Sequence, residues 1–148
     1  MSGNPVFGHI GHCVTDLERA KRFYMEALGF ELLNEISVPD SPADKLLRVE
    51  APLGLRAAYL RKDGFILELM AFDRSGNPGA QERVVNQPGL THLALSVDDV
   101  DAVVQRAVEL GARVLAETHI GTAVHVRDPD GQLIELFPNS SRAWIYGS

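Results

Sequence analysis

The feature that most constrains this chain is an internal repeat. Residues 9–17 read HIGHCVTDL and residues 92–100 read HLALSVDDV, so a His, a Val five places on and an Asp seven places on coincide. The end of each copy repeats as well, since residues 63–69 read DGFILEL and residues 130–136 read DGQLIEL. Two copies of one pattern must bury similar apolar faces, so both copies are predicted to share one topology.

Each copy predicts a strand, a helix and then further strands that end in a hairpin. Residues 17–28 and 100–110 carry apolar side chains at helical spacing. Asp16 and Asp99 stand immediately before these stretches and are predicted N-caps. An Asp-Gly pair between two apolar runs indicates the turn of a hairpin. The sequence therefore predicts an α+β fold made of two βαβββ modules.

The modules are expected to form one domain over residues 1–148. The stretch between them is rich in Gly, Pro and Asn, which is typical of a linker. The predicted boundaries are module 1 at about 6–72, linker 73–88, module 2 at about 89–137 and tail 138–148.

Composition excludes several classes of function. The net charge is −6 and the basic residues are scattered, which argues against nucleic-acid binding. No apolar run is long enough to span a bilayer, and no signal peptide is visible at the start of the sequence. The chain has one cysteine, Cys13, so it cannot form an internal disulfide. We expect a cytoplasmic protein with no membrane or nucleic-acid partner.

The strands that begin at His9 and His92 each place small residues on the face of that His. Side chains alternate between the two faces of a strand, and the residues between the small ones are mostly apolar. Small neighbours leave open space in front of an imidazole, as a ligand cavity requires. The small residues are Gly11 and Cys13 in the first copy, and Ala94 and Ser96 in the second.

Glu68 and Glu135 each stand inside an apolar strand, at the same place in both copies. A buried carboxylate is costly unless it is paired or bound to a cation. Together with His9 and His92 they form a set of two imidazoles and two carboxylates. Such a set suits one divalent ion: Fe²⁺, Ni²⁺, Zn²⁺, Co²⁺ or Mn²⁺. The sequence predicts a metal site with these four ligands.

Residues 9–29 and 128–136 resemble the vicinal oxygen chelate superfamily, which contains glyoxalases, bleomycin resistance proteins and extradiol dioxygenases. The resemblance implies an open, cup-like β-barrel with the helices outside. It implies metal ligands at His9, Glu68, His92 and Glu135, and a small-molecule substrate bound through two neighbouring oxygens. It also implies a homodimer, in which the modules pair within one chain or between chains.

One reaction that the resemblance implies is glyoxalase I-like or epimerase-like chemistry. In it a glutamate on the metal moves a proton through a metal-bound enediolate, which makes an isomerase or a lyase. The glutathione-binding Arg and Asn of glyoxalase I are replaced here by Cys13 and Phe72. Methylmalonyl-CoA epimerase has a glutamine where this chain has Glu68. A substrate that lacks glutathione and coenzyme A fits these differences.

The resemblance also covers Fe²⁺-dependent dioxygenases, and this is the reaction that the sequence favours, with a small aromatic or polyketide-like substrate. Iron would be held by His9, His92 and Glu135, and an octahedral ion needs Glu68 to leave before substrate and O₂ can both bind. His125 stands where the extradiol signature has its Tyr, and an imidazole can perform acid–base work near neutral pH. The predicted catalytic residues are Glu135, Glu68, His125 and His119.

A third possibility is a drug-binding resistance protein of the bleomycin type. Proteins of that type bind their ligand without the metal set. The complete set of His9, Glu68, His92 and Glu135 distinguishes this chain from them.

Overall fold

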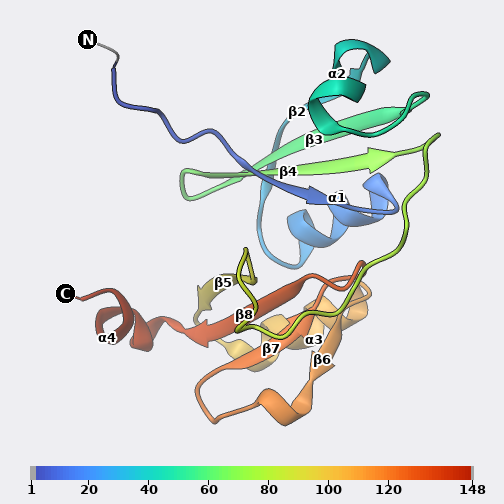
Figure 1. Ribbon diagram of the computed structural model, residues 1–148. Coiled ribbons are helices and arrows are strands. Elements are labelled where there is room, and N and C mark those ends of the chain that lie inside the picture. The colour runs from blue at the N-terminus through green and yellow to red at the C-terminus, as the bar shows by residue number, and fades with distance from the viewer. Residues whose placement is uncertain (1–2, 148) are drawn as a thin grey trace. The chain divides into compact units, whose positions relative to one another are not determined.

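The first half of the chain forms a four-stranded mixed sheet with a helix along one face. A computed structural model describes residues 3–147, and it divides into two compact units with the boundary between Pro78 and Gly79. The strand order is β1-β4-β3-β2, and only the β1–β4 pair is parallel. The elements, seen in Figure 1, are β1 (Ile10–Cys13), α1 (Leu17–Glu26), β2 (Glu31–Val38), α2 (Asp40–Leu47), β3 (Leu55–Lys62) and β4 (Phe65–Phe72).

The second half repeats this topology. Its strand order is β5-β8-β7-β6, again with one parallel pair, β5–β8. The elements are β5 (His92–Val97), α3 (Val100–Glu109), β6 (Arg113–Leu115), η1 (Ala116–Thr118), β7 (Val124–Arg127), β8 (Leu133–Pro138), η2 (Asn139–Ser141) and α4 (Arg142–Tyr146). The predicted α+β class and the two βαβββ modules are confirmed. We call the two halves module 1 and module 2.

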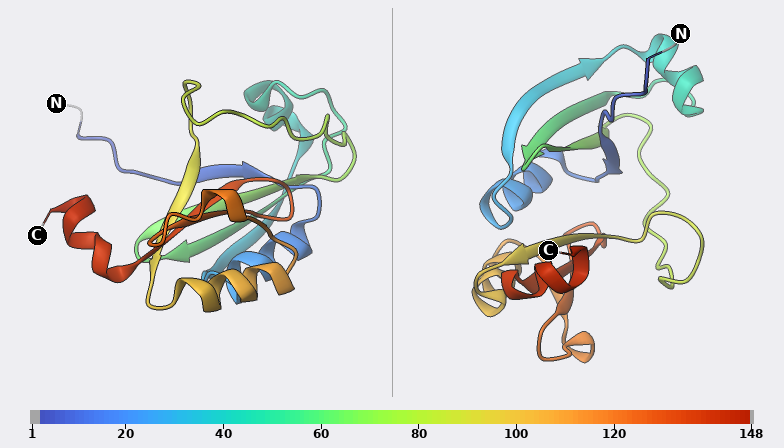
Figure 2. Two further views of the ribbon diagram at one scale, coloured as in Figure 1. Left: turned by 90° about the horizontal axis from the view of Figure 1, so that it is seen from below. Right: turned by 90° about the vertical axis from the view of Figure 1, so that its left-hand side faces the viewer.

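The helices begin where their N-caps predict. Asp16 Oδ1 accepts a hydrogen bond from Arg19 N at 3.0 Å, and Asp99 Oδ1 accepts one from Ala102 N at 3.0 Å. In Figure 2, α1 (blue) follows one face of the first sheet and α3 (gold) follows one face of the second. Each helix therefore covers one face of its own sheet and leaves the opposite face free for polar side chains.

Strand alternation separates the two faces of β4. Leu67 and Leu69 are buried on the face that α1 covers, whereas Glu68 points to the other face. The core of module 1 lies between α1 and this apolar face. The buried residues of α1 are Leu17, Ala20, Phe23 and Tyr24.

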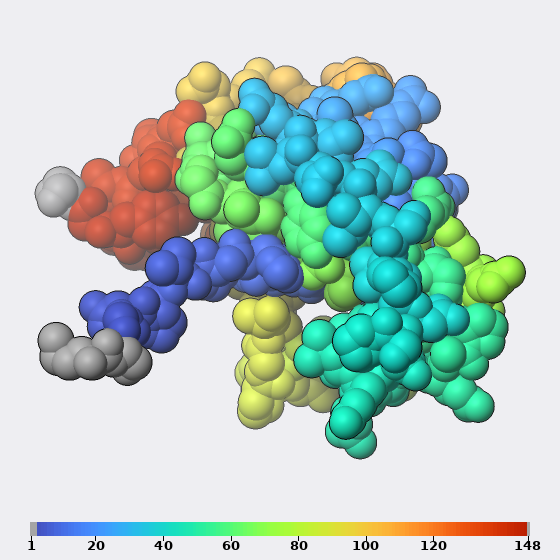
Figure 3. Space-filling model, turned by 90° about the horizontal axis from the view of Figure 1, so that it is seen from above, coloured from blue at the N-terminus to red at the C-terminus, as the bar shows by residue number. Residues whose placement is uncertain are grey.

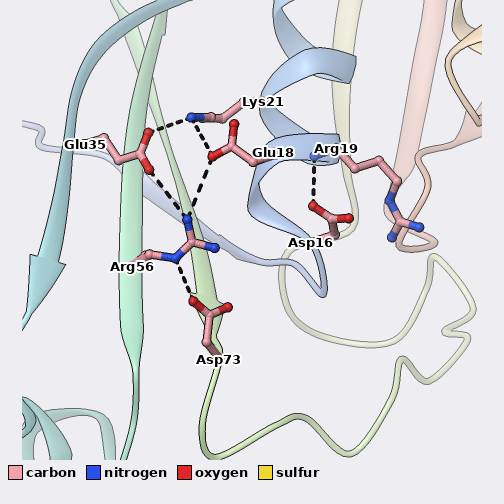
Figure 4. Close-up of polar contacts among 7 residues, drawn as sticks. All are labelled: Asp16, Glu18, Arg19, Lys21, Glu35, Arg56 and Asp73. Carbon is pink, nitrogen blue, oxygen red and sulfur yellow. Dashed lines mark hydrogen bonds and ion pairs between the residues drawn. The ribbon is translucent and has the colours of Figure 1, made fainter.

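A network of charges closes one edge of module 1 (Figure 4). Lys21 on α1 lies 2.6 Å from Glu35 on β2 and 2.9 Å from Glu18. The Arg56 Nε on β3 donates to Asp73 Oδ2 at 2.6 Å, and Arg56 Nη1 lies 3.8 Å from Glu35. The Asp73 carboxylate raises the pKa of Arg56, and the hydrogen bond to Glu35 raises the pKa of Lys21. The network ties α1 to β2 and β3.

Two helices were not anticipated from the sequence. α2 follows β2, and α4 lies in the predicted tail. α2 contains Pro42 and non-helical backbone at Ser41, and α4 spans only residues 142–146, so neither shows helical periodicity. Figure 3 shows α2 (teal) at the surface of module 1, beside the exposed strand β2 (cyan). Within residues 3–147, no helix is both long enough and apolar enough to cross a membrane.

Candidate metal centre

Module 1 brings His9 and Glu68 together on the face of its sheet that α1 does not cover. His9 stands just before β1, and Gly11 pairs with Glu68 across the β1–β4 ladder. The His9 Nε2 lies 2.8 Å from Glu68 Oε2. A Cβ at position 11 would lie 3.0 Å from the side chain of Met70 and 3.6 Å from Glu68 Oε2. Glycine at this position therefore leaves room for the pair.

Tyr59 fixes the second oxygen of Glu68. The two residues are direct partners in the β3–β4 register, and the Tyr59 hydroxyl donates to Glu68 Oε1 at 3.0 Å. The Tyr59 ring also meets the His9 ring edge-on, with 5.4 Å between centroids. Burial raises the pKa of Tyr59, and the hydrogen bond to Glu68 acts in the same direction. The Glu68 side chain, 13% exposed, is thus held through both oxygens.

Module 2 brings its own His and Glu together in the same way. His92 Nε2 lies 3.1 Å from Glu135 Oε2, and Ala94 pairs with Glu135 across the β5–β8 ladder. Thr91 Oγ1 lies 2.8 Å from His92 Nδ1. With its proton on Nδ1, the imidazole donates to the threonine hydroxyl and keeps the Nε2 lone pair for a metal. Glu135, 29% exposed, is more open than Glu68.

His125 lies on the face of module 2 that carries this pair. It is the register partner of Glu135 on β7, and its ring centroid is 5.9 Å from that of His92. It occupies the position in module 2 that Tyr59 occupies in module 1, because each is the antiparallel partner of the glutamate. An imidazole that can exchange protons therefore stands beside the second pair.

His119 lies elsewhere in module 2. It follows η1, is exposed, and accepts a hydrogen bond at Nδ1 from Gly121 N at 3.1 Å. It lines a cavity of about 330 Å³ with Asp98, Asp99 and Asp101. Among the described residues, no contact joins it to His92 or Glu135. A catalytic role for His119 stays a prediction.

Comparison with known proteins identifies the family. The sequence profile of the Glyoxalase/Bleomycin resistance protein/Dioxygenase superfamily matches residues 6–136. The chain belongs to this superfamily. It is 32% identical to the uncharacterised protein YaeR of Escherichia coli K12, over 93% of this chain and 98% of that protein. It is 28% identical to a probable lactoylglutathione lyase of Synechocystis, over 87% of this chain and 92% of that protein.

Solved structures of superfamily members share the fold. A glyoxalase family protein of Bacillus cereus superposes with a TM-score of 0.71 at 21% identity, covering 92% of this chain and 96% of that one. A fosfomycin resistance protein FosX from Listeria monocytogenes superposes with a TM-score of 0.62 at 21% identity, covering 90% and 91%. That FosX structure, of a mutant with glutamine in place of a glutamate, contains Mn(II) and a dihydroxypropylphosphonic acid.

The two pairs fit the divalent metal that this superfamily binds. Neighbouring ligands at right angles, each about 2.1 Å from an ion, lie about 3 Å apart. The His–Glu separations of 2.8 and 3.1 Å match that spacing. Each module supplies one imidazole and one carboxylate, and within either module no third His, Cys, Asp or Glu joins the pair among residues 3–147. Each module therefore holds a pair with the spacing of two neighbouring metal ligands.

Sequence reasoning identified both pairs but overlooked one of the groups that hold them. The antiparallel partnership of Tyr59 with Glu68 follows from a two-residue turn at Asp63-Gly64, so it could be read from the sequence. The hydrogen bond between His92 Nδ1 and the Thr91 hydroxyl could not be predicted, because hydroxyl residues beside a histidine are common. The structure shows this hydrogen bond, because it gives the orientation of the Thr91 and His92 side chains.

Proposed function

We propose that His9, Glu68, His92 and Glu135 hold one divalent metal ion, and that the protein is a metal-dependent isomerase or lyase. It would move a proton between neighbouring carbons of a small substrate that carries two adjacent oxygens. The support is the repeated His–Glu pair, at 2.8 Å in module 1 and 3.1 Å in module 2. When bound, the ion supplies positive charge that binds both substrate oxygens and stabilises developing negative charge.

The unequal environment of the two glutamates carries the proposal. Glu68 contacts His9 and accepts a hydrogen bond from Tyr59. Glu135 contacts His92, and its side chain is about twice as exposed, 29% against 13%. A general base must come within hydrogen-bond reach of the substrate proton, which a more exposed carboxylate with fewer contacts can do more readily. We therefore assign the proton transfer to Glu135 and a fixed ligand role to Glu68.

The relatives support this choice of chemistry. The Synechocystis relative is named a probable lactoylglutathione lyase, and a bovine relative, 26% identical over 86% of this chain and 71% of that protein, is a methylmalonyl-CoA epimerase. The Mn(II) in the Listeria FosX structure favours Mn²⁺ alongside Ni²⁺, Zn²⁺ and Co²⁺ as the resident ion. Cys13 and Phe72 replace the glutathione-binding residues, so the substrate is not expected to be a glutathione adduct.

A Fe²⁺-dependent dioxygenase is the second candidate. It is favoured by His125, which stands beside His92 where it could exchange a proton with a phenolic substrate. It requires Glu68 to leave the metal so that substrate and O₂ can bind together. The hydrogen bond from Tyr59 opposes that departure, because breaking it would leave a partly buried hydroxyl unpaired. The isomerase or lyase is therefore preferred.

Metal analysis followed by an exchange assay tests the proposal. Protein purified without chelator or metal affinity resin should contain about one divalent ion per site, and metal removal should lower its Tm. In D₂O, the loaded protein should exchange for deuterium the proton beside the carbonyl of an α-hydroxyketone or of an α-oxoaldehyde adduct. NMR would follow the loss of that proton signal. Oxygen consumption with catechols and no exchange would favour the dioxygenase. A protein that is purified without metal, and whose Tm does not change when metals are added, would reject both the isomerase or lyase and the dioxygenase.

Assembly is a separate part of the proposal. We propose a homodimer, as the family resemblance implies. Light scattering at micromolar concentration should give twice the mass of one chain. A monomer that still binds one ion would show that a single chain supplies all the metal ligands.

A further inference from the structure

The C-terminal helix α4 follows β8 and η2, and two of its side chains contact the face of module 2 that carries His92 and Glu135. Arg142 Nη1 donates to Ser96 Oγ at 2.8 Å. The guanidinium also lies over the ring of Tyr146, 5.2 Å from its centroid. Tyr146 in turn packs against buried Phe137, with 6.3 Å between ring centroids. The Arg142 side chain is exposed, yet contacts on two sides orient it.

The strand register places this guanidinium on the same sheet face as His92 and Glu135, and nearer to Glu135. His92, Ala94 and Ser96 share one face of β5. Ala94 pairs with Glu135, and Ser96 pairs with Phe137, one step further along the same face. Two residues along a strand span about 7 Å. Ala94 is small and exposed, so the space above it, between the His92–Glu135 pair and Arg142, is open.

The charge of Arg142 is not neutralised within the described chain. Arg113 and Arg127, the other arginines of this sheet face, both lie within 4.0 Å of the Glu82 carboxylate. Arg142 makes no ion pair with any of residues 3–147; its contacts are with a hydroxyl and an aromatic ring. A guanidinium held by neutral groups keeps free N–H donors that suit a carboxylate or a phosphate.

We propose that Arg142, positioned by Ser96, binds an anionic group of the substrate. This inference rests on the proposed function and narrows it. The substrate is a small acid whose carboxylate or phosphate lies roughly 7 Å, the span of two strand residues, from the two oxygens that reach the metal. The net charge of −6 gives this acid no general electrostatic attraction, so a local cation is needed to hold it.

Among residues 3–78, module 1 offers no equivalent group at the matching position. Cys13 occupies on β1 the place that Ser96 occupies on β5, two residues beyond the small residue that pairs with the glutamate. The matching position on β4 is Met70, which packs into the apolar cluster beneath α2. The anionic end of the substrate is therefore assigned to module 2.

Two matched chelators test this assignment by binding rather than by turnover. We would titrate the Mn²⁺-loaded protein with 3,4-dihydroxybenzoate and with neutral 3,4-dihydroxybenzamide, which present the same pair of oxygens, and follow the heat of binding. The wild type should bind the benzoate about tenfold more tightly. R142Q should lose that preference and bind the benzamide unchanged, and S96A should lose part of it. The phosphonate analogue of the acid distinguishes a phosphate subsite from a carboxylate subsite.

R106Q is the control, because Arg106 is an exposed arginine of α3, which covers the other face of the sheet. It removes the same charge and should keep the tenfold preference. An equal affinity of the wild type for the benzoate and the benzamide would overturn the inference and leave the metal site standing. A preference that survives in R142Q would also overturn it. Failure of the loaded protein to bind either chelator would overturn the proposed function as well.

Discussion

The two modules share a topology and a His–Glu pair, but they differ in how tightly that pair is held. In module 1, the glutamate is 13% exposed and both of its oxygens have partners. In module 2, the glutamate is 29% exposed, and the residue at the position of Tyr59 is His125. The repeat therefore provides one fixed carboxylate and one freer carboxylate. Two chemically identical side chains, Glu68 and Glu135, can in this way take different roles.

The helix packing on the opposite face of each sheet also differs between the modules. α1 buries four residues against its sheet, including the large aromatic side chains of Phe23 and Tyr24. α3 buries only Ala107, which occupies the position in module 2 that Tyr24 occupies in module 1. Tyr24 also meets Phe30 and His12 edge-on, at 5.7 and 6.0 Å between centroids. Module 1 has the larger core and should contribute more to the free energy of unfolding.

The helices α2 and α4 extend this contrast to the sheet face that carries the His–Glu pair in each module. α2 covers an apolar cluster in which Ala43, Leu53 and Leu55 are buried and Met70 is partly buried. α4 is shorter, and it places a charged guanidinium rather than an apolar side chain on the face that carries the His–Glu pair. Module 1 covers this part of its sheet with an apolar cluster, whereas module 2 places the Arg142 guanidinium beside Ser96.

Glutamate substitutions test the division of roles most strongly. E135Q should lower kcat of the proton-exchange reaction by about 10³-fold, equivalent to about 4 kcal/mol, because it removes the base. E68Q should mainly weaken metal binding, because it replaces a fixed ligand. Exchange kinetics at saturating metal, combined with metal titrations of both variants, would check this. Equal losses of kcat in the two variants would show that the glutamates are equivalent.

Tyr24→Ala gives module 1 a residue of the size that module 2 has at the matching position. Tyr24 is fully buried, so the substitution should lower the free energy of unfolding by about 3 kcal/mol, through lost burial and the cavity that remains. Val103→Ala on half-buried α3 should cost about 1 kcal/mol. Urea unfolding of both variants measures the difference. Similar losses would contradict the unequal packing of the modules.

Tyr59→Phe removes the donor that holds Glu68 without removing the ring. We expect the affinity for metal to fall about tenfold, as is usual when a group that orients a ligand is lost. At saturating metal, kcat should change little, since Glu135 keeps its environment. Tyr146→Phe is a matched control in module 2. A large fall in kcat with unchanged metal affinity would instead place Tyr59 in the proton transfer itself.

The repeat made the sheet topology and both His–Glu pairs predictable. A two-residue turn at Asp63-Gly64 sets the register of β3 and β4, and that register alone brings Tyr59 opposite Glu68. In module 2 the matching Asp-Gly lies in a longer connection, residues 128–132, which the Asp128 carboxylate closes by accepting from Asp130 N and Gln132 N. His125 still faces Glu135, because the register is kept.

The features that the sequence does not predict depend on tertiary contacts. α4 has five residues, too few for an apolar stripe, so nothing marks it as a helix or directs Arg142 toward Ser96. The same applies to His119, whose spacing suggested a catalytic group. η1 and the turn after it place His119 in a cavity with Asp98 and Asp101, and its catalytic role stays a prediction. Positions set by short helices and turns depend on packing, which residue spacing does not encode.

The charge network of module 1 offers the smallest test of the contrast. Lys21, 15% exposed, bridges Glu18 and Glu35, and module 2 has Val104 at the matching position. Lys21→Met should therefore lower the free energy of unfolding by about 0.5–1 kcal/mol. Arg22→Met on the same helix is the control, because the Arg22 side chain is 67% exposed and should contribute almost nothing.

The pH dependence of this difference has a definite sign. The hydrogen bond to Glu35 raises the pKa of Lys21 in the folded protein, so folding favours the charged ammonium. The stabilisation should be complete below the unfolded lysine pKa of about 10.4 and should disappear as the pH rises through the higher folded pKa. Urea unfolding of wild type and Lys21→Met should therefore converge at strongly alkaline pH. A gap that stays constant would mean that Lys21 stabilises module 1 through packing of its alkyl chain.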